Sequence, residues 1–215
     1  MRRSIIVWTL ITAGNCTVLA AQQNPTLEAT GNSYQMFDIN GRTFVNPAAD
    51  VEGSPYFNDE WIFGSAILQN TRYDSVRLRL DLHTQEVHYL NRNNNELVLP
   101  KGLVKEVVWK NGPHDSTRFQ CGFPATETHD INSFYLVLSS GKCTLLHCIT
   151  KSISKQKNEM SGEVRKEYAA DEDYYLYDNK TMQRVKKSTA IIDGKQVKFK
   201  TIDDLKTAVD RYNEL

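Results

Sequence analysis

Apolar and polar residues alternate with a period of two along residues 76–83, which read Val-Arg-Leu-Arg-Leu-Asp-Leu-His. Successive side chains of a β-strand point to opposite faces of a sheet, so this pattern predicts a half-buried antiparallel strand. The same period continues over residues 86–90 after a short connection. We therefore expect the two segments to form a hairpin.

Further short segments carry strand patterns and are separated by turn residues: 96–99, 103–109, 133–138, 143–149, 173–178 and 182–185. The connections hold Asn, Gly, Pro and Ser, the residues that favour turns. Segments 133–138 and 143–149 are apolar on both faces, which predicts a hairpin at the centre of the sheet.

Only the C-terminus has helical periodicity. Its apolar residues recur at spacings of three and four: Ile202, Leu205, Ala208, Val209, Tyr212 and Leu215. Thr201 and Asp204 have the spacing of a capping box, with Asp in place of the usual Glu. We therefore expect a mainly β fold, an antiparallel meander forming a curved sheet or barrel-like domain, with a short C-terminal helix over residues 202–214.

The first twenty residues have the order of a secretory signal. A cationic head, Met1-Arg2-Arg3, precedes the apolar residues 5–13, and Val18-Leu19-Ala20 fits the small-x-Ala cleavage pattern. The alternative is a buried N-terminal strand. We predict a signal peptide at 1–20, a flexible polar segment at 21–33 and one β-rich domain at 34–215. The protein is then exported to the periplasm or the cell exterior, where association with the outer membrane is one option.

Composition narrows the classes of partner. The chain has 26 basic and 26 acidic residues, so it lacks the cationic excess that binding to nucleic acid requires. No second apolar run approaches the length of a membrane-spanning helix, and no glycine-rich phosphate loop or Cys-x-x-Cys pair is present. We expect no nucleic-acid partner, no integral membrane segment and no cofactor.

Three cysteines follow the predicted signal: Cys121, Cys143 and Cys148. An oxidising compartment permits one disulfide, and the odd spacing of Cys143 and Cys148 along one strand leaves Cys121 as the partner of either. The alternative is three buried thiols that pack as small hydrophobic groups.

Three motifs resemble a group of exported proteins from Bacteroidetes-type bacteria. They are the Gly-Ser-Pro-Tyr segment at 53–56, the Leu-Arg-Leu-Asp strand at 78–81 and the tail Tyr-Asn-Glu-Leu at 212–215. The group's strand motif reads Leu-Arg-Tyr-Asn, so Leu80 and Asp81 depart from it. The resemblance implies an exported, β-rich protein and no particular activity, because the group has no assigned activity.

The same resemblance implies two modification sites. Bacteria of this kind attach O-glycans at Asp-Ser/Thr-aliphatic sites of exported proteins, and the sequences at 74–76 and 115–117 are of this type. The acceptors would be Ser75 and Ser116. Asp-Ser is also a common turn sequence, which is the alternative interpretation.

The hairpin at residues 81–88 holds the best candidate metal site. If Thr84-Gln85 forms a two-residue loop, His83 opposes Glu86 and Asp81 opposes His88, with all four side chains on one face. Two imidazoles and two carboxylates at this spacing could bind zinc. The loop lacks the Gly or Asn that short hairpins favour, and the polar face of an ordinary half-buried sheet has the same composition.

Two aromatic groups could line a sugar or lipid site: Tyr56-Phe57 with Trp61, and Tyr174-Tyr175 with Tyr177. The alternative is core packing. Because no catalytic constellation is evident, we expect a non-enzymatic binding or interaction module whose partners are envelope proteins. One alternative is a carrier of an apolar ligand, held in a cavity between the strands around 76–82 and 133–149. The other is a hydrolase with residues scattered along the chain.

Overall fold

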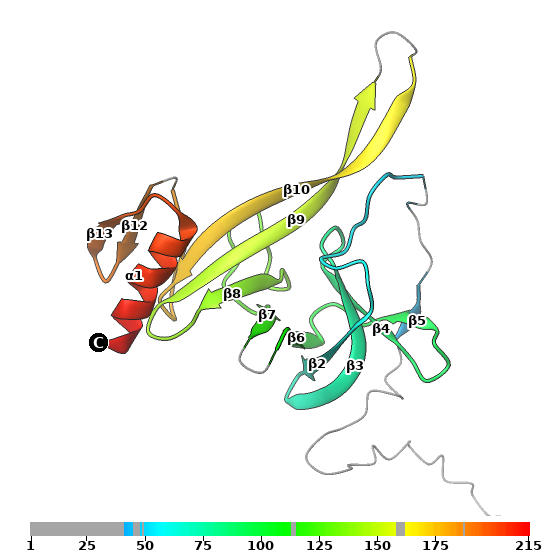
Figure 1. The fold of residues 1–215 in the computed structure, drawn as a ribbon, viewed down its shortest axis with the longest axis horizontal. Coiled ribbons are helices and arrows are strands. Elements are labelled where there is room, and N and C mark those ends of the chain that lie inside the picture. The colour runs from blue at the N-terminus through cyan, green and yellow to red at the C-terminus, as the bar shows by residue number, and fades with distance from the viewer. Residues whose placement is uncertain (1–40, 45–47, 49, 113–114, 158–161, 187) are drawn as a thin grey trace, which may run out of the picture.

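The computed structural model describes residues 41–44, 48, 50–112, 115–157, 162–186 and 188–215. These residues form an antiparallel sheet of 11 strands, a separate two-stranded sheet and an α-helix (Figure 1). The predicted mainly β fold with a short C-terminal helix is confirmed. The large sheet is open, because β1 and β11 form its two edges. The predicted signal peptide at 1–20 and the polar segment at 21–33 lie outside the described residues.

The elements in chain order are β1 (Arg42–Thr43), β2 (Ile62–Leu68), β3 (Thr71–Asp81), β4 (Glu86–Leu90), β5 (Glu96–Val98), β6 (Val104–Lys110), β7 (Ser116–Gln120), β8 (Tyr135–Ser139), β9 (Thr144–Lys157), β10 (Val164–Tyr177), β11 (Met182–Arg184), β12 (Thr189–Ile192), β13 (Lys195–Lys198) and α1 (Ile202–Glu214). In the large sheet the order is β1-β5-β4-β3-β2-β6-β7-β8-β9-β10-β11. Strands β2–β5 and β6–β11 therefore form two meanders that meet where β2 pairs with β6, and β1 is added at the outer edge of β5.

The alternation in β3 buries one face of the strand. Val76, Leu78 and Leu80 are buried, and they pack with residues of β2, β4 and β6, including Val107 and Trp109. Burying aliphatic side chains of this size is the main stabilising contribution of such a face, about 1.5–3 kcal/mol for each side chain. The periodic pattern of the sequence is thus explained by a core on one side of this half of the sheet.

Strands β8 and β9 form the hairpin predicted from residues 133–138 and 143–149. They lie in the interior of the sheet but near its β11 edge, so the prediction that they are central is wrong. They are apolar on both faces because each face is covered. Leu145 packs in a cluster with α1 and β12, whereas Leu146 packs on the other face with Tyr135 and Tyr175.

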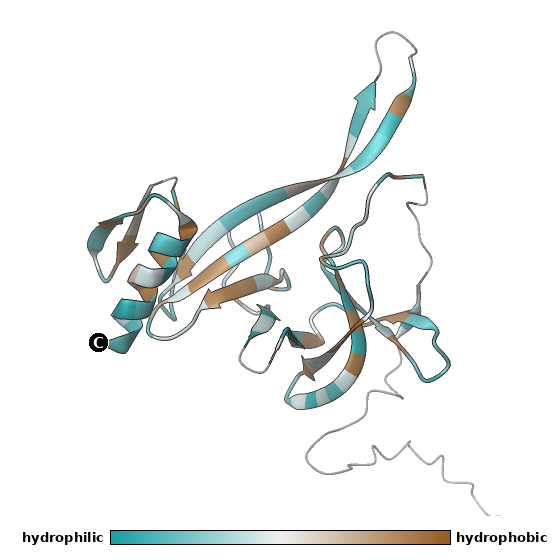
Figure 2. Ribbon diagram, in the orientation of Figure 1, coloured by the Kyte–Doolittle hydropathy of each residue, from teal (hydrophilic) through white to brown (hydrophobic). Residues whose placement is uncertain are grey.

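Strands β9 and β10 form a long arm. They pair from Thr144↔Tyr177 to Lys157↔Val164. Strand β8 accompanies β9 only as far as Cys148, and the outer part of the arm projects from the body (Figure 1). Figure 2 shows mainly hydrophilic colours on that outer part. Because it has no apolar alternation, the sequence patterns did not identify it.

The C-terminal helix is fixed at both ends. A capping box joins Thr201 and Asp204 at its start. Near its end, the Asn213 amide donates to the Cys143 carbonyl at 2.8 Å and accepts from the Cys143 amide at 2.9 Å. Gly141 permits this approach, since a Cβ there would lie 2.5 Å from Cγ of Asn213. With Leu205 fully buried, these contacts dock α1 on the β8–β9 hairpin.

Candidate functional site

The register of the β3–β4 hairpin differs from the predicted one. Asp81 pairs with Glu86, and Arg79 pairs with His88, so residues 82–85 form the turn. The prediction that His83 opposes Glu86 and Asp81 opposes His88 is therefore wrong. The turn begins at Asp81, whose carboxylate Oδ1 accepts the backbone N–H groups of residues 83 and 84 at 2.7 and 2.8 Å. Aspartate commonly stabilises turns in this way.

The four side chains of the predicted zinc site have largely separate partners. The His83 ring donates from Nδ1 to the Lys151 carbonyl at 2.8 Å, and Glu86 forms an ion pair with Arg42. Only Asp81 and His88 remain close, with Oδ2 and Nε2 4.0 Å apart. No group of three or more metal-binding side chains suited to a metal ion occurs in the described part of the chain.

His88 instead belongs to a buried polar network around Glu96. The carboxylate Oε1 of Glu96 accepts from His88 Nδ1 at 2.7 Å, Arg79 Nη2 at 3.0 Å and the Tyr56 hydroxyl at 3.2 Å. The Arg79 guanidinium also lies between the rings of Tyr56 and Trp61, 3.9 and 4.0 Å from their centroids. The His88 side chain is 1 % exposed. The network joins the segment before β2 to strands β3, β4 and β5. Its role is therefore to stabilise the fold.

The predicted modification sites are both at the surface. Ser75 is exposed in a β-bulge of β3, with a φ of 57°. Ser116 is exposed at the start of β7. Both hydroxyls are accessible, and their modification stays a prediction.

The three thiols after the predicted signal are buried and unpaired. Burial raises the pKa of the Cys148 thiol to about 12 and raises the pKa values of Cys121 and Cys143. A disulfide between Cys121 and either partner is absent from this structure. The three side chains pack as small hydrophobic groups.

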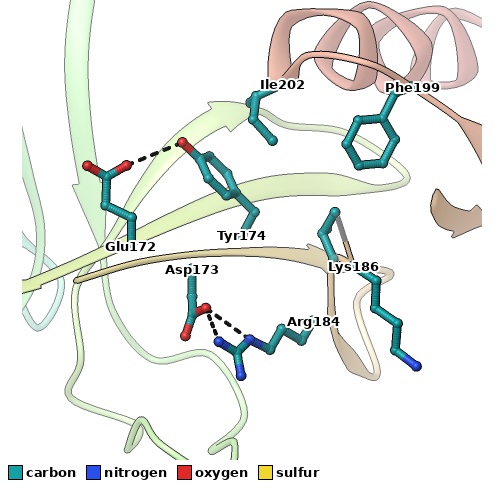
Figure 3. A pocket seen from close by; sticks show the side chains of 8 residues that line it. Glu172, Asp173, Tyr174, Arg184, Lys186, Phe199 and Ile202 are labelled. Carbon is teal, nitrogen blue, oxygen red and sulfur yellow. Dashed lines mark hydrogen bonds and ion pairs between the residues drawn. The ribbon is translucent and has the colours of Figure 1, made fainter. Parts of the chain in front are cut away.

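A groove opens where β10 and β11 meet the segment that leads into α1 (Figure 3). Its volume is about 630 Å³. The lining residues are Glu172, Asp173, Tyr174, Arg184, Val185, Lys186, Phe199 and Ile202. The pairing of β10 with β11 brings residues 172–174 close to residues 184–186. Phe199 and Ile202 join them because they pack in one apolar cluster with Val185.

Tyr174 and Glu172 form one wall of the groove together with His147 behind them. The rings of Tyr174 and His147 are stacked, with centroids 4.3 Å apart and planes 13° apart. His147 Nε2 donates to Glu172 Oε2 at 2.9 Å, and the Tyr174 hydroxyl lies 3.5 Å from the same oxygen. Burial lowers the pKa of His147 despite this carboxylate, and burial also raises the pKa of Tyr174. The Tyr174 ring is thus held in one orientation.

A charged rim lies beside this wall. Arg184 donates from Nε to Asp173 at 2.9 Å, and His129 Nε2 approaches the other carboxylate oxygen at 3.7 Å. Asp173 raises the pKa of Arg184. Lys186 follows on the same side, where its side chain extends away from the other labelled residues (Figure 3). The rim therefore offers fixed carboxylate and guanidinium groups to a ligand.

The opposite wall is apolar. Phe199 is buried three residues before the start of the helix, and Ile202 is the first helical residue. Val185 continues the pairing of β11 with β10, because its N–H donates to the Tyr174 carbonyl at 2.8 Å. A groove with one apolar wall, one oriented aromatic ring and a polar rim is suited to reversible binding of a ligand with mixed polarity.

The two aromatic groups singled out in the sequence have different environments. Tyr174 lines the groove, whereas Tyr175 and Tyr177 pack on the other face of the sheet with Phe123. Phe57 is packed against Trp109, with ring centroids 6.1 Å apart. The sequence patterns missed His147 and Glu172 as a pair. Their meeting depends on the register of β9 with β10, which places His147 opposite Tyr174 and diagonal to Glu172.

None of the helices in the described residues has the length and hydropathy that crossing a lipid bilayer requires. No protein-family model matches the chain, and no curated protein and no solved structure is significantly similar to it.

Proposed function

We propose that this chain is an exported cell-envelope protein that acts as a non-enzymatic binding module, with the groove beside α1 as its binding site. The observation that carries the proposal is the Tyr174 ring, which His147 holds in one orientation at an open groove with an apolar wall and a charged rim. Aromatic rings fixed in this way provide contact area at a low cost in conformational entropy.

The packing of the sheet favours this groove over the alternative cavity between the strands around 76–82 and 133–149. Leu78 and Leu80 pack directly against other side chains of the core, and so do Leu145 and Leu146 in their own clusters. Space for a ligand occurs outside these faces, at the junction of β10 and the segment before α1.

The groove is tested by probing arrays of immobilised peptides and saccharides with the purified protein and its variants. We expect Tyr174→Ala to weaken every specific interaction by about tenfold or more, since truncating a central aromatic anchor typically costs about 2 kcal/mol or more. Phe63→Ala is the matched control, because this aromatic side chain is 64 % exposed on β2, outside the groove. Equal binding by the wild type and Tyr174→Ala would refute the groove as the binding site.

Export is tested by the intact mass of the protein isolated from its own cells. Cleavage after Ala20 predicts a chain that begins at Ala21 and is found in the envelope or the medium. A full-length chain recovered from the cytoplasm contradicts this part of the proposal and leaves the groove experiment unaffected.

A further inference from the structure

One edge of β10 lacks a strand partner beside the groove. On one side, β10 pairs with β9 along its whole length. On the other side, Glu52 bridges to Glu167 at one end, and β11 begins to pair at Tyr175. In the part of the chain that the structure describes, residues 169–173 therefore have a neighbouring strand on the β9 side only.

The hydrogen bonds at the two ends of this gap show which backbone groups face outward. The Lys166 carbonyl and the Tyr168 N–H bond to Glu52, and the Tyr174 carbonyl accepts from Val185. Because the N–H and C=O of one residue point to the same side of a strand, the even-numbered residues face the open edge. Both backbone groups of Ala170 therefore point outward, and neither has a partner among the described residues.

Glu172 has a local substitute for a strand partner at this edge. Its outward N–H donates to the side chain of the preceding residue, Asp171, at 3.2 Å, in the place where a neighbouring strand would offer a carbonyl. Residues 169–173 contain no lysine or proline, and the charges that they do carry are acidic. Such charges oppose the addition of an acidic strand but not of a basic one. An added strand would satisfy the free groups in register.

The negative charge near the open edge of β10 favours an added strand that carries basic residues. Asp171, Glu172 and Asp173 are consecutive, and Asp203 lies in the first turn of α1. Among the described residues, Asp171 and Asp203 have no ion-pair partner, whereas Glu172 pairs with His147 and Asp173 pairs with Arg184. An extended peptide with basic residues complements this surface. Its alternate side chains would face Glu172 and Tyr174 at the groove.

We propose that the open edge of β10 at residues 169–173 captures an extended cationic peptide segment of another protein as an added β-strand, with alternate side chains entering the groove. The proposal rests on the proposed function and defines its ligand class. The backbone of β10 supplies affinity, and the groove and the carboxylates supply selectivity.

The experiment measures binding of a capped synthetic peptide of alternating lysine and valine, about nine residues long, by isothermal titration calorimetry. Ala170→Pro removes the outward N–H and leaves the bonds to β9, so we expect binding to weaken by at least about tenfold. Ala170→Val keeps the N–H and is the matched control, for which we expect wild-type affinity. Circular dichroism establishes that both variants are folded.

A second measurement uses the wild-type protein with two N-methylated forms of the same peptide. One form carries methyl groups on the odd-numbered amides and the other on the even-numbered amides. Since only alternate amides of a strand bond to its neighbour, we expect one form to bind and the other to bind at least about tenfold more weakly.

Equal affinity of both methylated forms, or of Ala170→Pro and Ala170→Val, would overturn strand addition. If Tyr174→Ala still reduces binding in that case, the groove remains the binding site and recognises side chains alone. Failure of the wild-type protein to bind the peptide also overturns strand addition, and the array experiment then decides the proposed function separately.

Discussion

Glu96 illustrates how one residue can connect several elements. Its carboxylate accepts from His88 on β4, Arg79 on β3 and Tyr56 before β2, and its own side chain is 22 % exposed. Buried donors that lose their common acceptor are costly, because they remain desolvated without a partner. The residue therefore matters for stability far more than its position in a three-residue strand indicates.

We expect Glu96→Ala to lower the free energy of unfolding by about 2–4 kcal/mol, since it leaves the buried His88 and Arg79 without their acceptor. Urea denaturation followed by circular dichroism measures the change. Glu106→Ala on β6 is the control, because Glu106 has no ion pair or side-chain hydrogen bond among the described residues, and we expect a change within about 0.5 kcal/mol. Similar effects for both variants would contradict a special role of the network.

His147 makes stability depend on pH. Burial lowers its pKa in the folded protein, so the unfolded chain binds the proton more tightly. Its contribution to stability is complete above the unfolded pKa, near 6.5, and is lost as the pH falls below that value. The charged or titratable groups that face it are Glu172 and Tyr174 on β10, with Asp203 of α1 close to Tyr174.

We expect the wild type to lose more unfolding free energy than His147→Gln between about pH 7.5 and about pH 5.5. The variant keeps a side-chain donor for Glu172 but does not titrate, and the other histidines contribute equally in both proteins. Urea denaturation at several pH values gives the two slopes. Parallel pH profiles would show that His147 is not the group responsible.

Helix α1 is docked on the sheet by apolar contacts and by hydrogen bonds near its C-terminal end. Its apolar stripe buries Leu205 and Val209, and the Asn213 amide holds the backbone of Cys143. The helix also forms one side of the groove through Ile202. We therefore expect that loosening the C-terminal end of α1 would weaken the docking of the whole helix and disturb the side of the groove that it forms.

We expect Asn213→Ala to lower the free energy of unfolding by about 1–2 kcal/mol, because two hydrogen bonds to the Cys143 backbone are lost. The control is Asn93→Ala, an exposed asparagine in the turn before β5, for which we expect almost no change. Thermal denaturation measures both. If the two variants have the same midpoint, the clamp does not contribute to helix docking.

At the scale of the whole molecule, the fold is held by three core clusters and by sheet hydrogen bonds, with three free thiols buried among them. A molecule of this size can bury enough apolar surface to be stable without a cross-link. The absence of a disulfide among residues 121–148 is consistent with this, because the thiols lie in separate clusters.

We expect a reductant to leave the thermal midpoint unchanged within about 1 °C, whereas loss of a disulfide would typically cost about 2–5 kcal/mol. A maleimide should label the thiols at positions 121, 143 and 148 only after denaturation, since all three are buried. A midpoint that falls by several degrees in reductant would show that a disulfide forms in the protein as purified.

Elements with a local signal are predictable from the amino-acid sequence alone. The alternation in β3 and the three-and-four spacing in α1 arise from the direction of successive side chains, so each could be identified without knowing its neighbours. The hairpin of β8 and β9 was identified in the same way, from turn residues between apolar runs. The capping box of α1 is also local, because Thr201 and Asp204 lie within one turn.

The pairings that create the sites depend on contacts between segments far apart in the chain. The register of β3 with β4 depends on a turn that the Asp81 side chain stabilises. This register places His88 in a network with Glu96. The groove depends on the pairing of β10 with β9 and β11, which places Tyr174 beside His147 and near Ile202. Such contacts form because distant segments have surfaces that can bury one another. The periodicity within a single segment does not indicate which partner segment it will pack against.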